Sequence, residues 1–113
     1  MNWLLKDQSS CRPDFLPDHI ERRLRFALAR FGSRVERVIV FLHDRNGPRG
    51  GIDKVCRVLA RVQGCGVMTA AVVDADWTAA VDRAINRVGH TVSRHLDRLR
   101  EQRVGQPREA LRG

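Results

Sequence analysis

The chain has 113 residues, which is room for one domain with a single core. Hydrophobic residues make up 42% of it and charged residues 30%, a composition that is typical of an ordered soluble protein and argues against a largely disordered chain. The sequence holds 21 Lys and Arg against 13 Asp and Glu, so its net charge is +8. Such a cationic excess on a small domain favours a polyanionic partner, most often nucleic acid.

Membrane and secreted proteins are disfavoured by the sequence. The longest unbroken apolar stretch, Val38–Leu42, is far too short to span a bilayer, and the first residues lack the charged head and long apolar stretch of a secretory signal. The three cysteines form no Cys-x-x-Cys pair, which argues against a disulfide scaffold and for a reducing compartment. We therefore expect a cytoplasmic protein with no membrane partner.

Residues 1–17 are predicted to form an amino-terminal segment. The apolar residues 3–5 favour a short strand within it. Pro13 and Pro17 then interrupt any extended pairing, because proline cannot donate a hydrogen bond to a strand ladder.

A first helix is predicted to begin at Asp18. Asp18 can cap the helix, and Glu21 follows it at capping-box spacing. A stop is expected at Gly32, which accepts a left-handed turn. The apolar stripe of this helix consists of Ile20, Leu24, Ala27, Leu28 and Phe31. Its other faces carry Arg22, Arg23, Arg25 and Arg30.

Three strands are predicted next, over residues 37–43, 54–62 and 67–73. These stretches are rich in β-branched residues and alternate between two faces. Residues 44–51 form a loop that is dense in turn formers. Because the connections are short, we expect an antiparallel meander.

The last predicted helix starts at Asp76, which can cap it, and runs to about Arg100. At about 100° per residue, its apolar side is formed by Trp77, Val81, Ala84, Ile85, Val88, Val92, Leu96 and Leu99. The opposite side carries Arg83, Arg87, His90, Arg94 and Arg98. We expect residues 18–101 to form the folded domain and residues 102–113 to form a flexible basic tail.

The cationic side of the last helix is the strongest functional signal. Between Arg83 and Arg103, six arginines against Asp97 and Glu101 give a local net charge of +4. Cations one helical turn apart repel each other by a few tenths of a kcal/mol per pair. Phosphates would relieve that repulsion and release counterions. A solvated polar face is the alternative interpretation of this stripe.

No catalytic or metal site is predicted. The four His and three Cys residues show none of the ligand spacings of zinc sites. No serine has a nucleophile-elbow context, and the glycine-rich residues 46–51 lack the Gly-Lys-Ser/Thr of a phosphate-binding loop. We therefore expect a non-enzyme without a cofactor.

Local sequence in residues 18–100 matches a known pattern. Residues 30–42 (RFGSRVERVIVFL), 44–47 (DRNG) and 51–56 (GIDKVC) are followed at residues 76–82 by DWTAAVD, an Asp-aromatic-x-Ala-Ala-aliphatic-Asp helix opening. In this order, they make the chain resemble the ribosome hibernation-promoting factor family, also described as ribosome-associated inhibitor A. It resembles a short form, because long members carry an additional carboxy-terminal domain.

This resemblance implies an α+β fold of order β-α-β-β-β-α, with two helices on one face of a mostly antiparallel four-stranded sheet. It also implies a translation inhibitor that binds rRNA in the decoding region of the small ribosomal subunit and sterically excludes mRNA and tRNA during dormancy or stress. Basic helix positions of the family fall on Arg87, His90 and Arg94. The wider set of rRNA-binding candidates adds Arg22, Arg23, Arg25, Arg30, Arg83 and Arg98.

The amino terminus departs from the family pattern. The stretch before the first helix is longer than in the family and contains Pro13 and Pro17, so the usual first strand is expected to be displaced, shortened or absent. Two alternatives stay open. One is a general nucleic-acid-binding regulatory module. The other is a protein-interaction domain, or a weak homodimer, acting through the open sheet face around Ile39, Phe41 and Leu59.

Overall fold

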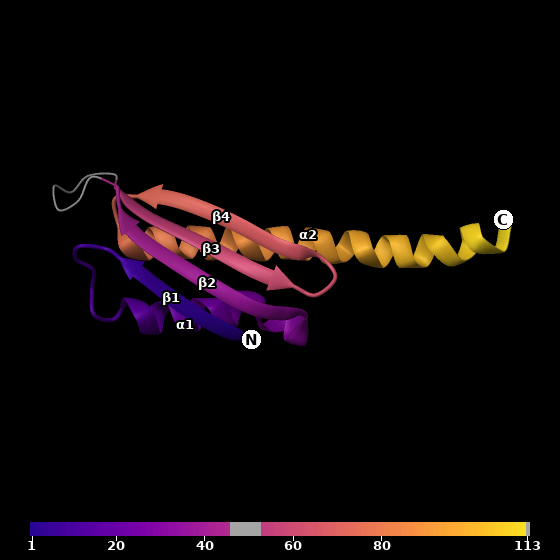
Figure 1. The fold of residues 1–113 in the computed structure, drawn as a ribbon, viewed down its shortest axis with the longest axis horizontal. Coiled ribbons are helices and arrows are strands. Elements are labelled where there is room, and N and C mark those ends of the chain that lie inside the picture. The colour runs from indigo at the N-terminus through magenta and orange to yellow at the C-terminus, as the bar shows by residue number, and fades with distance from the viewer. Residues whose placement is uncertain (46–52, 113) are drawn as a thin grey trace.

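A four-stranded sheet with two helices on one of its faces forms the fold (Figure 1). The computed structural model describes the backbone of residues 1–45 and 53–112, and side chains as far as Glu101. The elements are, in chain order, β1 (Asn2–Gln8), α1 (Leu16–Leu28), the 3₁₀ helix η1 (Ala29–Arg34), β2 (Val35–Asp44), β3 (Lys54–Val62), β4 (Gly66–Asp74) and α2 (Trp77–Arg112). The predicted two-layer α+β fold is confirmed. Of the predicted loop 44–51, residues 46–51 lie outside the described part of the chain.

The strands lie side by side in chain order. β1 pairs with β2 in parallel, whereas β2–β3 and β3–β4 are antiparallel, as the predicted meander requires. A parallel pair needs a long crossover connection, and α1 supplies it. The first strand is present, so its expected loss is wrong: β1 includes the predicted strand residues 3–5 and is seven residues long, and the side chains of Trp3 and Leu5 pack against the core. The amino-terminal residues Asn2–Gln8 are therefore part of the same sheet as β2, β3 and β4.

The start of α1 differs from the prediction. The helix begins at Leu16 rather than Asp18, and no side chain caps it. Pro17 occupies its first turn, where a missing N–H costs nothing and the fixed φ of proline suits a helix. Leu16 is fully buried, which anchors this turn on the core. The end of α1 also differs from the predicted stop at Gly32: the helix ends at Leu28 and η1 follows, with Gly32 at a positive φ of 58° inside it.

The core lies between the helices and one face of the sheet. Alternate strand residues supply it: Val38, Val40 and Leu42 from β2, and Cys56, Val58, Ala60 and Val62 from β3. The helices contribute Ile20, Leu24, Leu28, Val81, Ile85, Val88 and Val92. Burial raises the pKa of the Cys56 thiol to about 12, so this cysteine is a neutral core residue near pH 7.

The amino end of α2 is capped as predicted, because Asp76 Oδ2 accepts a hydrogen bond from Ala79 N at 2.9 Å. The predicted helix end near Arg100 is wrong, because α2 continues to Arg112. The added stretch is rich in Arg, Gln and Glu, which are good helix formers, and Gly105 and Pro107 lower that propensity without ending the helix. None of the described helices is long and apolar enough to cross a membrane.

The two helices run parallel and touch along their length. His19 Nε2 lies 2.7 Å from Asp82 Oδ1, and Arg23 Nη2 donates to Asn86 Oδ1 at 3.0 Å. One turn farther on, Gly89 of α2 faces Ala27 of α1. A Cβ at this buried position would still fit between the helices, since its nearest neighbour would lie 3.7 Å away.

Replacing Gly89 by Ala is expected to raise the free energy of unfolding by about 1 kcal/mol, because Gly costs that much relative to Ala inside a helix. The added Cβ would lie 3.7 Å from the Ala27 carbonyl oxygen, which is ordinary van der Waals contact. Urea denaturation followed by circular dichroism measures the change. Gly64→Ala is the matched control and should destabilise, since Gly64 has a φ of 81°. A Gly89→Ala protein less stable than wild type would contradict the prediction.

Candidate nucleic-acid interface

Four arginines and one histidine form an exposed ridge on α2. We call Arg83, Arg87, His90, Arg94 and Arg98 the α2 ridge, and all five are exposed, as the helical periodicity predicts. The apolar side of the same helix is buried from Trp77 to Val92, so packing fixes the direction in which the ridge faces. Within the described side chains, neither Arg87 nor Arg94 forms an ion pair with a carboxylate. Their charges are therefore available to an external anion.

Arg83 differs from the rest of the ridge. Its Nη1 lies 3.1 Å from Asp74 Oδ2. The pKa of Asp74 is lowered, first by the backbone N–H of Asp76, which donates to Oδ1 at 3.0 Å, and then by Arg83. Arg83 thus ties the end of β4 to the start of α2 and has part of its charge matched inside the protein.

A groove runs between α2 and β4, the edge strand. Its volume is about 530 Å³, and it is lined by Thr69, Ala70, Arg87, His90, Thr91 and Arg94. Arg87 Nη1 donates to the Ala71 carbonyl oxygen at 3.4 Å, which directs this side chain along the strand edge. The three ridge residues that the family resemblance singles out therefore line one open groove. Guanidinium groups in such a place suit phosphate oxygens, which they contact through paired N–H donors.

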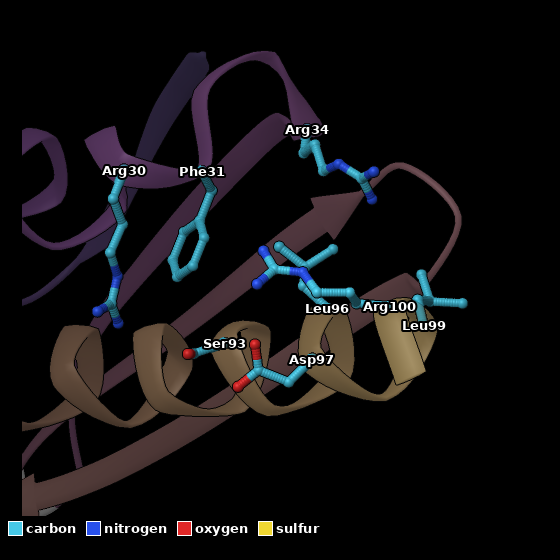
Figure 2. Close-up of a pocket in the computed structure, with 8 residues that line it drawn as sticks. All are labelled: Arg30, Phe31, Arg34, Ser93, Leu96, Asp97, Leu99 and Arg100. Carbon is cyan, nitrogen blue, oxygen red and sulfur yellow. The ribbon is translucent and has the colours of Figure 1, made fainter. Parts of the chain in front are cut away.

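A second pocket lies on the opposite flank of α2, between its carboxy-terminal half and η1 (Figure 2). Its volume is about 370 Å³, and Phe31, Leu96 and Leu99 form its apolar part. Arg30, Arg34 and Arg100 surround it, together with Ser93 and Asp97. Arg34 and Arg100 were not predicted as site residues. Helical spacing could have placed Arg100 beside Leu96, but only the tertiary fold brings η1 to it.

The candidates on the predicted first helix, of which Arg30 lies in η1 and the others in α1, do not form one surface. Arg22 is exposed. Arg23 is held by Asp82 and Asn86 of α2, so it is a helix–helix contact. Arg25 pairs with Glu21, whose pKa is lowered first by the indole N–H of Trp3 and then by Arg25. Arg30 stacks over Phe31 at 4.7 Å from the ring centroid and borders the second pocket. These placements leave α2 as the centre of the candidate interface.

Among the described residues, no group of three or more His, Cys, Asp or Glu side chains is placed to hold a metal ion. The groups that line the groove are guanidinium groups, an imidazole and threonine hydroxyls, all on a helix or a strand. Such groups bind anions through charge and hydrogen bonds.

Comparison with known proteins gives a result only at the level of structure. No protein-family model and no curated protein sequence matches the chain. A ribosomal subunit interface protein from Coxiella burnetii superposes with a TM-score of 0.70 at 14% identity, covering 86% of this chain and 99% of that one. The N-terminal domain of Protein Y from Thermus thermophilus gives 0.63 at 25% identity, covering 84% and 99%. These neighbours confirm the resemblance seen in the sequence, and the chain has the fold of the ribosome hibernation-promoting factor family.

Proposed function

We propose that this protein associates with the ribosome, binds rRNA in the decoding region of the small subunit and blocks translation by occupying the space that mRNA and tRNA need. One observation carries the proposal: Arg87, His90 and Arg94 line a single open groove on a fold shared with a ribosomal subunit interface protein. It acts by binding, without catalysis, in the cytoplasm and under conditions in which ribosomes are idle.

The mechanism follows from the chemistry of the α2 ridge. RNA helices are recognised mainly through their phosphates, 2′-hydroxyls and shape, which needs cations in fixed positions rather than a base code. A helix that is packed firmly on a sheet supplies such positions. Val88 and Val92, on the buried side of α2, are fully buried and hold the helix in one orientation. Exclusion of mRNA and tRNA is then steric and requires no movement of the domain.

Occupancy and exclusion can be measured in one experiment. Purified small subunits are incubated with a labelled mRNA fragment and increasing amounts of the protein, then separated on a sucrose gradient. We expect the protein to co-sediment with small subunits and bound mRNA to fall in proportion. Large subunits and free duplex RNA at matched salt serve as controls. Simultaneous binding of protein and mRNA would refute exclusion, and equal affinity for free duplex RNA would favour a general nucleic-acid-binding module.

A further inference from the structure

The sheet face opposite the helices is covered by neither of them (Figure 1). The side chains of alternate strand residues point to this open face. Its charged residues are Lys6, Arg37, Arg57 and Arg61, and all four are exposed. Among the open-face residues of β2 from Arg37 to His43, and the residues of β1, β3 and β4 in the same rows, there is no Asp or Glu. Glu36 lies beside it, in the bulge that precedes Arg37. The open face is therefore cationic, as the α2 ridge is.

One row of residues crosses this face from edge to edge. Lys6 of β1 pairs with Phe41 of β2, Phe41 with Arg57 of β3, and Arg57 with Ala71 of β4. Two cations flank the aromatic ring: Lys6 Nζ is 5.8 Å and Arg57 Cζ 4.8 Å from the centroid of Phe41. These contacts hold the two charges on a fixed apolar platform. We call Lys6, Phe41, Arg57 and Ala71 the sheet row.

The sheet row leads to the α2 ridge. The carbonyl oxygen of Ala71, at the β4 end of the row, accepts the hydrogen bond from Arg87. Ala71, the residue of the sheet row between Arg57 and this edge, has only a methyl side chain and is exposed. A cationic track thus continues from α2, around the edge of β4, onto the open face.

We propose that the sheet row binds a single-stranded RNA segment, which continues around the β4 edge from the RNA held by the α2 ridge. This inference rests on the proposed function and adds a second RNA-contacting surface to it. Sheet faces that combine an aromatic ring with cations bind single-stranded RNA by stacking a base on the ring or on an adjacent guanidinium plane, and by neutralising the neighbouring phosphates. Continuity with the ridge favours RNA over an acidic polypeptide, because one polyanion can then occupy both surfaces.

The test uses the full chain and a fluorescein-labelled, mixed-sequence RNA of about 12 nucleotides, a length in the range that one sheet-based binding site covers. Binding is followed by fluorescence anisotropy at two salt concentrations. We expect Arg57→Glu to raise Kd about tenfold and to reduce its salt dependence. Arg45→Glu, at an exposed bend after β2, is the matched control and should change Kd less than about threefold. Phe41→Leu, which keeps an apolar side chain, should raise Kd about fivefold through lost stacking.

Three outcomes would overturn the proposal. If Arg57→Glu and Arg45→Glu lowered RNA affinity equally, the loss would be explained by the change in net charge alone. If the Phe41→Leu protein bound RNA as tightly as wild type, and polyglutamate bound as tightly as RNA, the open face would be a binding site for an acidic protein instead. An Arg57→Gln variant that folds as wild type by circular dichroism and keeps full RNA affinity would also refute it. The readout needs no ribosomes, so a failure of small-subunit binding would refute the proposed function without touching this result.

Discussion

Replacing both Arg87 and Arg94 by Glu is expected to abolish co-sedimentation of the protein with small ribosomal subunits. Hydrogen bonds to charged groups contribute about 1.5–3 kcal/mol each, so losing two such phosphate contacts lowers affinity by at least about 100-fold. Neither arginine is bonded to a described carboxylate, and both are exposed, so the fold does not depend on their charge. We expect the free energy of unfolding to change by less than about 0.5 kcal/mol.

Two controls separate a local contact from bulk charge in this experiment. Each single reversal, Arg87→Glu or Arg94→Glu, is compared with Arg45→Glu, which changes the net charge equally but lies outside the α2 ridge. Repeating the binding across salt concentrations adds a second readout, because each lost phosphate contact should lower the slope of log affinity against log salt by about one. A double variant that still co-sediments at wild-type affinity would remove the α2 ridge from the interface.

Arg23 shows why a count of exposed arginines is a poor guide to such an interface. From sequence it is equivalent to Arg22 and Arg25, since all three lie off the apolar stripe of the first helix. In the fold, the Arg23 guanidinium contacts Asp82 and Asn86 of α2, which are far from it in the sequence. An Arg23→Glu variant would therefore report on helix packing, and a loss of ribosome binding in it would not identify an RNA contact.

The elements that sequence predicted well are those set by local periodicity. The α2 ridge was predictable because a rigid 3.6-residue repeat with an apolar side fixes which residues face outward. The two faces of β2 and β3 follow from a two-residue repeat in the same way, and Val38 and Ile39 fall on opposite faces as expected. Local pattern failed at the start of α1: a cap was expected at Asp18, but the helix begins at Leu16, whose side chain is buried in the core.

The features that sequence did not predict depend on contacts between distant residues. The parallel pairing of β1 with β2 joins segments separated by α1, and no local pattern encodes it. The second pocket combines η1 with the far half of α2, so Arg34 and Arg100 acquire a common surface only in the folded chain. The sheet row likewise needs the register of all four strands, which a single sequence leaves open.

Lys54 neutralises two buried carboxylates at the end of the sheet where α2 begins. Its Nζ lies 3.2 Å from Asp53 Oδ1 and 3.8 Å from Asp44 Oδ1. Asp53 is fully buried and only 4% of the Asp44 side chain is exposed. Backbone N–H of Ser10 donates to the other Asp44 oxygen at 2.8 Å, which ties the segment after β1 to the same cluster. This ion cluster therefore joins the ends of β2 and β3 to the connection that precedes α1.

Replacing Lys54 by Met is expected to lower the free energy of unfolding by about 3–5 kcal/mol, because removing one partner of a buried ion pair leaves the other charge uncompensated. Lys6→Met, at an exposed position, is the matched control and should cost less than about 0.5 kcal/mol. Adding Asp53→Asn to Lys54→Met should recover part of the loss, since it removes one stranded charge without changing the side-chain volume. Urea denaturation measures all three. A loss below about 1 kcal/mol for Lys54→Met would mean that water reaches these carboxylates and that the cluster is not a structural element of the fold.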